Sequence, residues 1–90
     1  MTEAECRERL AASGYRETRT IVYEPHHAPD LHTHEFSAMG VVTEGRLTLV
    51  YADRRETFEV GDWYEVPAGT PHAEHTGDEP TRALVGITPG

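Results

Sequence analysis

The residues best suited to chemistry are histidines in two separate groups. His32 and His34 are two positions apart, and His72 directly follows a turn-forming run of prolines and glycine at 67–71. Side chains two apart on a strand point to the same face, so the first two imidazoles can share one ion. If both segments are strands of one barrel, all three imidazoles converge inside it. Neutral imidazoles are good ligands for transition metals, so the sequence predicts one divalent transition metal per chain.

The second group is the more specific signal. A His-x-His spacing is short enough to arise by chance among 6 histidines, and a pair of surface histidines would look the same. Gly61, Pro67 and Gly69 precede His72 in a longer pattern, in which each residue supplies turn geometry. Coincidence is a poor explanation for the combined pattern.

Short strands must position these histidines. Runs of β-branched and aromatic residues separated by turn residues are typical of strands. We expect strands at 20–23, 36–43, 46–51, 56–60, 64–66 and 82–88. Strands of this length and spacing indicate a barrel or a sandwich.

A short helix is expected at 3–13. Thr2 is placed to cap it, Glu5 to complete a capping box, and Gly14 to end it. Its apolar residues are few and small apart from Leu10, so the helix should depend on docking against the rest of the domain.

Length and composition limit the class of protein. A chain of 90 residues supports one modest core, so we assign one domain to 1–90, with the helix in 1–14 and the barrel in 18–88. The net charge of -8 opposes binding to nucleic acid and to anionic membranes. Cys6 is the only cysteine, the N-terminus is acidic and no apolar run could span a bilayer, so we predict a cytoplasmic protein.

Taken together, the two histidine motifs resemble those of the cupin superfamily, and in particular its small single-domain, conserved-barrel members. The first family motif is His-x-His with a later glutamate and glycine, and the second is Gly, Pro-x-Gly and a further His. The matching positions here are His32, His34 and Gly45, then Gly61, Pro67, Gly69 and His72. The resemblance implies an all-β fold, a small β-barrel of the jelly-roll (double-stranded β-helix) type with a short N-terminal helix. It also implies His32, His34 and His72 as metal ligands.

Three positions depart from the family motifs. Ala38 occupies the glutamate position, His26 the opening glycine position, and Thr76 a position that often carries asparagine. The first departure matters most, because in the family that glutamate usually completes the metal shell. The small side chain of Ala38 leaves room for a pocket, and Phe36 shares its strand parity and should line the same pocket.

Glu74 is the acidic residue best placed to replace the missing carboxylate. It shares strand parity with His72, so in a regular strand its side chain faces the interior. A direct metal ligand, a hydrogen-bond partner of a ligand histidine and a contact to bound substrate all remain open, and Glu74 is our candidate catalytic residue. Glu35 has the opposite parity to His34 and is expected to point outward into solvent.

The other three histidines are assigned away from the site. His75 faces outward in a regular strand, as an outer-face or interface residue, and only a bulge would turn it inward. His26 and His27 belong to a proline-bounded loop near one end of the barrel, and we interpret them as solvated loop residues rather than substrate contacts.

Most remaining large apolar residues are assigned to packing. They are Val42, Leu47, Leu49, Tyr51, Trp63, Tyr64 and Val66. Packing of one barrel against another would bury surface that so short a chain cannot cover, so we predict a homodimer.

Two functions are compatible with these residues. The metal could leave positions open for water, dioxygen or a chelating small molecule, as in a non-haem metal dioxygenase or a related lyase or isomerase. Alternatively, the barrel could be a non-catalytic module that binds a small molecule or a metal. Fold alone does not separate these functions. Three imidazoles suit Fe, Mn, Ni, Cu, Co and Zn, so neither the metal nor the substrate is specified.

Overall fold

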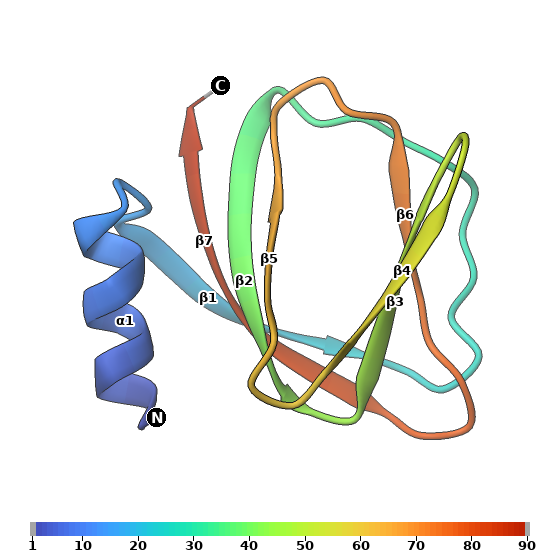
Figure 1. The fold of residues 1–90 in the computed structure, drawn as a ribbon, viewed down its shortest axis with the longest axis horizontal. Coiled ribbons are helices and arrows are strands. Elements are labelled where there is room, and N and C mark those ends of the chain that lie inside the picture. Colours follow the sequence, from blue (N-terminus) through green and yellow to red (C-terminus); the bar gives the residue numbers. More distant parts are fainter. Residues whose placement is uncertain (1, 90) are drawn as a thin grey trace.

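The computed structural model describes residues 2–89 and consists of two antiparallel sheets that face each other, with one helix outside them (Figure 1). The helix is α1 (Glu3–Ala12), and the strands are β1 (Glu17–Tyr23), β2 (Phe36–Glu44), β3 (Arg46–Tyr51), β4 (Arg55–Glu59), β5 (Trp63–Val66), β6 (His72–His75) and β7 (Thr81–Pro89). The strand order is β1-β7-β2-β5 in one sheet and β4-β3-β6 in the other. The predicted all-β barrel with a short N-terminal helix is confirmed.

The main core lies between the two sheets. Its buried members are Val42, Leu47, Leu49, Tyr64, Val66, Ala83 and Val85. They alternate with outward-facing residues along each strand, as the pleat requires. Residues paired across the first sheet, such as Ala38 with both Val66 and Ile87, share one face and line the interior as a row.

A second apolar cluster lies on the outer face of the first sheet, where α1 covers it (Figure 1). Cys6, Leu10 and Tyr15 pack there against Val41 and Leu84. Leu10 is completely buried, so the docking that the thin apolar stripe of the helix required is present.

The predicted cap of α1 is also present. The Glu5 amide donates to the Thr2 hydroxyl at 3.2 Å, and the Thr2 amide donates to the Glu5 carboxylate at 2.9 Å. These two bonds satisfy amides that have no partner within the helix.

The stretch before β2 differs from the sequence expectation. We name residues 24–35 the connecting segment; it joins β1 to β2, and within it only His32 forms a bridge, to His72. The condition under which the sequence argument brought His32 and His34 together, a strand around both, is therefore not met. Pro25 and Pro29 explain part of the difference, because proline has no amide to donate to a ladder.

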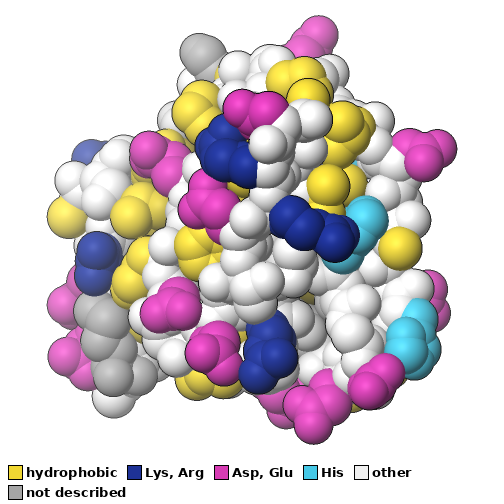
Figure 2. Space-filling model, turned by 45° about the vertical axis from the view of Figure 1, so that its right-hand side comes forward, with side chains coloured by type: hydrophobic (Ala, Val, Ile, Leu, Met, Phe, Trp, Pro, Cys, Tyr) yellow, Lys and Arg dark blue, Asp and Glu magenta, His cyan; other side chains and the backbone are white. Residues whose placement is uncertain are grey.

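Acidic side chains are spread over the surface and outnumber basic ones on the face shown in Figure 2, in line with 16 acidic and 8 basic residues in the chain. Within residues 2–89, no helix has the length and apolar character needed to cross a bilayer.

The contact between Tyr15 and β7 gives a test of helix docking. A Cβ atom at Gly86 would lie 2.7 Å from the Tyr15 Cβ and 3.0 Å from its carbonyl oxygen, so Gly86→Ala must push the chain after α1 away from the sheet. We expect the free energy of unfolding in urea to fall by about 1–3 kcal/mol. Gly77→Ala is the matched control, because no atom lies within 4 Å of its added Cβ, and it should change stability by less than about 0.5 kcal/mol. Equal effects of the two substitutions would contradict the docking argument.

Candidate metal centre

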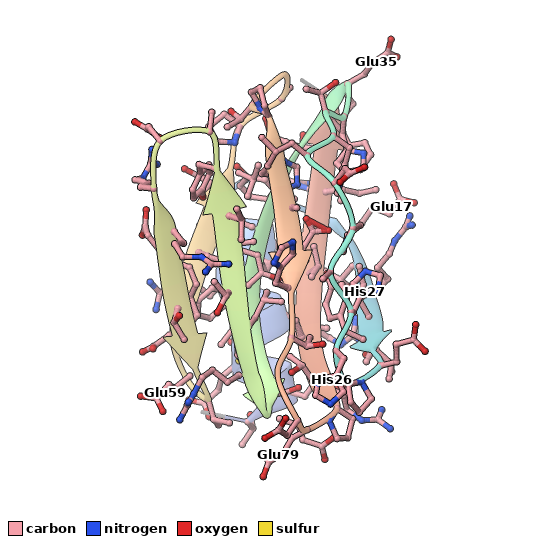
Figure 3. All side chains as sticks on the ribbon, turned by 90° about the vertical axis from the view of Figure 1, so that its right-hand side faces the viewer. Glu17, His26, His27, Glu35, Glu59 and Glu79 are labelled. Carbon is pink, nitrogen blue, oxygen red and sulfur yellow. The ribbon has the colours of Figure 1, made fainter. Side chains whose placement is uncertain are left out.

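The connecting segment is held against β6 by backbone bonds. The His32 amide donates to the His72 carbonyl at 2.8 Å, and the His72 amide donates back at 3.0 Å. Further along, the Thr76 hydroxyl accepts from the His27 amide at 2.9 Å and donates to the Glu24 carbonyl at 2.6 Å. The segment thus lies beside β6 as an irregular extension of the second sheet, and Figure 3 shows it passing there.

The turn before β6 connects the two histidine motifs. Gly69 has a φ of 79°, in the left-handed region that favours glycine, and its amide donates to the His34 carbonyl at 2.9 Å. The Thr70 amide closes the turn on the Pro67 carbonyl at 3.2 Å. The proline and glycine of the second motif therefore fix the first motif as well as their own turn.

Three imidazoles meet as a result. The ring centroid of His32 lies 4.9 Å from that of His34 and 4.8 Å from that of His72. The centroids of His34 and His72 are 5.4 Å apart. One nitrogen of each ring lies within 4.8 Å of the others, which is close enough to share one cation. The structure thus brings together the three histidines that the sequence singled out.

Backbone carbonyls orient two of these rings. The Nδ1 atom of His72 lies 2.8 Å from the Thr70 carbonyl oxygen, and that of His32 lies 3.2 Å from the Asp30 carbonyl oxygen. A carbonyl only accepts, so Nδ1 carries the proton in each ring, and a neutral ring keeps a lone pair on Nε2. This is the arrangement that presents Nε2 to a metal.

The third ring is kept neutral by its surroundings. Burial lowers the pKa of His34, and the neighbouring His32 and His72 lower it further, although the charge of Glu74 opposes them. A lowered pKa leaves His34 unprotonated near neutral pH and available as a lone-pair donor.

Glu74 faces the same point, as its parity with His72 predicted. Its Oε2 lies 3.1 Å from His72 Nε2 and 3.5 Å from His32 Nε2. That oxygen is buried and has no hydrogen-bond partner within the described chain. Two acceptors therefore face each other across 3.1 Å, an arrangement that needs a proton or a cation between them.

A cavity of about 270 Å³ opens beside these groups. Its wall is mainly apolar and includes the predicted pocket residues Phe36 and Ala38 along with Glu74. The other lining residues are Arg19, Ile21, Tyr23, His32, His34, Leu49, Tyr64, Val66, Pro67, His72, Val85 and Ile87. A cavity of this size and character suits a small, largely apolar molecule with a few polar contacts.

Sequence reasoning missed three polar residues of this wall. Arg19 and Tyr23 lie on β1, whose alternation places them on one face with Ile21, and Tyr64 lies on β5 opposite Gly40. Burial, with a contribution from the charge of Glu74, raises the pKa of both tyrosines, so both phenols stay protonated. The parity of 19, 21 and 23 was visible in the sequence, but the pairing of β1 with β7 was not.

The remaining histidines do not join the cluster. The Nε2 atom of His75 donates to the Pro29 carbonyl at 3.0 Å, so this ring fastens the connecting segment from the outer side. His26 is exposed, 3.6 Å from Asp78, and His27 lies against Tyr23 with ring centroids 5.8 Å apart. Glu35 points away from the barrel at one end, and Figure 3 labels it there.

Known structures share this architecture. A cupin-2 domain containing protein from Shewanella frigidimarina superposes with a TM-score of 0.65 and 23% identity, over 81% of this chain and 69% of that chain. The polyketide cyclase RemF from Streptomyces resistomycificus gives a TM-score of 0.69 and 31% identity, over 80% of this chain and 52% of that chain. The DMSP lyase DddQ from Ruegeria pomeroyi gives a TM-score of 0.70 and 23% identity, over 81% of this chain and 37% of that chain.

These neighbours differ in extent from the present chain, which spans about half the length of the cyclase and 37% of the lyase. No curated protein matches the chain in sequence. The family model Cupin_2, described as a cupin domain, matches residues 19–87, which is well over half of the sequence. The chain belongs to the cupin family.

Proposed function

We propose that this cupin holds one divalent transition metal through His32, His34 and His72 and acts on a small molecule in the adjoining cavity. The reaction class that we propose is that of a non-haem metal dioxygenase or a related lyase or isomerase. The observation that carries the proposal is the meeting of three ring nitrogens within 4.8 Å beside a cavity of about 270 Å³.

The donor chemistry fits such a metal. Three imidazole nitrogens suit Fe, Mn, Co, Ni, Cu and Zn, and the buried Glu74 oxygen without a hydrogen-bond partner is what a missing cation would leave behind. When bound, the metal would act as a Lewis acid or a redox centre toward the small molecule.

The chain's own residues supply the rest of the site. Phe36, Ala38 and Ile87 form an apolar wall that excludes water and orients a bound molecule. Tyr23 and Tyr64 present protonated phenols to the same cavity, where each can donate a hydrogen bond to a bound small molecule. Glu74 lines the same cavity and is our candidate catalytic residue.

The similarity to a polyketide cyclase at 31% identity and to a DMSP lyase supports an enzymatic role. The second candidate is a non-catalytic module in which the metal stabilises the fold or captures a ligand. It is favoured by one observation: two of the three histidines lie in the irregular connecting segment, which a metal would tie to β6.

We also propose that residues 1–90 form one domain that acts in the cytoplasm as a homodimer. Val22, Leu31 and Val60 expose 58%, 43% and 62% of their surface, and a partner chain could cover such side chains. We expect sedimentation equilibrium at micromolar concentration to give the mass of two chains. A stable monomer would contradict the homodimer.

The metal site predicts the outcome of histidine substitution. Protein purified without an affinity tag or added metal should contain close to one transition-metal ion per chain by elemental analysis. His32→Ala and His72→Ala should each weaken metal binding by more than about a hundredfold, because each removes a donor nitrogen. His26→Ala, an exposed histidine of the same segment, should keep the metal. Unchanged metal content in His72→Ala would rule out the site.

Activity is tested on the same preparations. We expect metal-dependent oxygen uptake, or metal-dependent loss of substrate, with at least one member of a panel of diketones, thiols and phenols, and none with His72→Ala. Metal binding without turnover of any member would favour the binding module.

The room beside Ala38 predicts a separation of metal binding from ligand binding. Ala38→Leu adds three carbons to the cavity wall, so it should leave Co(II) affinity within about twofold and weaken acetylacetone binding to the Co(II) form by at least about tenfold, equivalent to about 1.4 kcal/mol. Absorption titrations report both affinities. Ala52→Leu, in the exposed β3–β4 turn, is the control and should change neither. Full acetylacetone affinity in Ala38→Leu would show that the ligand does not use this volume.

A further inference from the structure

We infer that Glu74 is a fourth protein ligand of the metal, so that the donor set is three nitrogens and one carboxylate oxygen. The inference rests on the proposed metal site and goes beyond it, because it assigns the carboxylate to β6.

The first step is geometric. Oε2 of Glu74 lies 3.1 Å from His72 Nε2 and 3.5 Å from His32 Nε2, the two nitrogens whose lone pairs are left free by the carbonyl bonds at Nδ1. Glu74 and His72 are two positions apart on one strand, so both side chains leave the same face of the sheet and reach one point.

The second step concerns charge. The Glu74 side chain is 18% exposed, and Oε2 itself is buried without a hydrogen-bond partner among residues 2–89. A buried carboxylate is costly unless a positive group lies next to it. Arg19 is the one Lys or Arg among the residues that line the cavity, and it is half exposed and paired with Glu17 at 3.2 Å. It does not provide the missing charge.

The third step separates a metal from a proton. One proton shared between Glu74 and His72 satisfies the 3.1 Å contact but gives no partner to His32 Nε2, 3.5 Å from the same oxygen, or to the His34 nitrogen of the cluster. A single metal ion gives Glu74 Oε2 a partner shared with His32 and His72, and the three ring nitrogens lie within 4.8 Å of one another, so the same ion also serves His34. The metal therefore accounts for more of the observed arrangement than the proton does.

The donor count also bears on the kind of metal. Four protein ligands complete a tetrahedral zinc site, the arrangement typical of structural zinc. A metal that accepts six ligands keeps positions for a small molecule with the same four donors. With these four donors, six-coordinate iron, manganese, cobalt or nickel would keep positions for a small molecule, whereas zinc would need to expand beyond four-coordination to bind one.

The test compares Glu74→Gln with Glu56→Gln. Glu56 is the matched control. Leu49 pairs with Glu56 on one side and with Glu74 on the other, so the two glutamates lie in one row across the second sheet. Unlike Glu74, Glu56 is exposed and forms an ion pair with Arg54. Co(II) is the probe, with affinity measured by competition against a chelator and coordination followed by the visible absorption bands of the ion.

We expect Glu74→Gln to weaken Co(II) binding by at least about tenfold and to shift the visible bands, because a charged oxygen donor is lost. Glu56→Gln should change neither. Glu74→Asp keeps the carboxylate on a shorter side chain and should fall between Glu74→Gln and the unmodified protein. Circular dichroism of the metal-free variants checks that each is folded.

The outcomes are distinct. An unchanged spectrum and affinity in Glu74→Gln would mean that the Glu74 carboxylate is not a ligand of the bound ion, and the inference would be overturned. In that case loss of metal in His72→Ala would leave the proposed function intact. Retention of metal in both Glu74→Gln and His72→Ala would instead remove the three-histidine site itself.

Discussion

The pair of backbone hydrogen bonds between His32 and His72 is the constraint on which the site depends. It joins a segment that has no strand of its own to β6, and it places two imidazoles on the same side of the second sheet. The Gly69 bond to His34 then sets the third ring, and Thr76 and His75 fasten the rest of the segment to the same strand. Because every one of these bonds ends on β6 or on the turn and residue that flank it, β6 and its preceding turn determine the position of the whole donor set.

The two faces of the first sheet have different roles: the outer face packs against the helix, and the inner face lines the cavity. The outer face carries α1 and a compact apolar cluster, in which Leu10 is completely buried and Gly86 allows Tyr15 to approach β7 closely. The first sheet is thus packed on its outer face even though its inner face lines a cavity of about 270 Å³. A chain this short buries little apolar surface on folding. The apolar surface buried under the helix compensates for part of the surface that the cavity leaves unpacked.

Sequence reasoning predicted the features that depend on local pattern. β3 begins and ends where expected, the Thr2–Glu5 capping box is present, and Glu74 faces inward because parity along a regular strand needs no partner. Sequence reasoning did not predict the features that depend on which strands pair with each other. The convergence of the histidines was argued on the condition that His32 lies on a strand, yet it forms a single bridge. The cavity roles of Arg19, Tyr23 and Tyr64 follow from strand neighbours that lie far away in the sequence. The departure of Thr76 from the family motif was noticed, but its two hydrogen bonds to the connecting segment could not be predicted without knowing which segment lies beside it.

The connecting segment is at once a wall of the cavity and the source of two of the three histidines. Any opening of the barrel that swings this segment outward would also withdraw His32 and His34. Small molecules that enter or leave while the metal stays bound must therefore use a route that leaves the segment in place. Release of the ion and opening of the segment are thermodynamically linked. An occupied centre would accordingly slow hydrogen exchange at the amide of His27, which belongs to no ligand, as well as at the amide of the ligand His32, because their bonds to Thr76 and His72 break in the same opening.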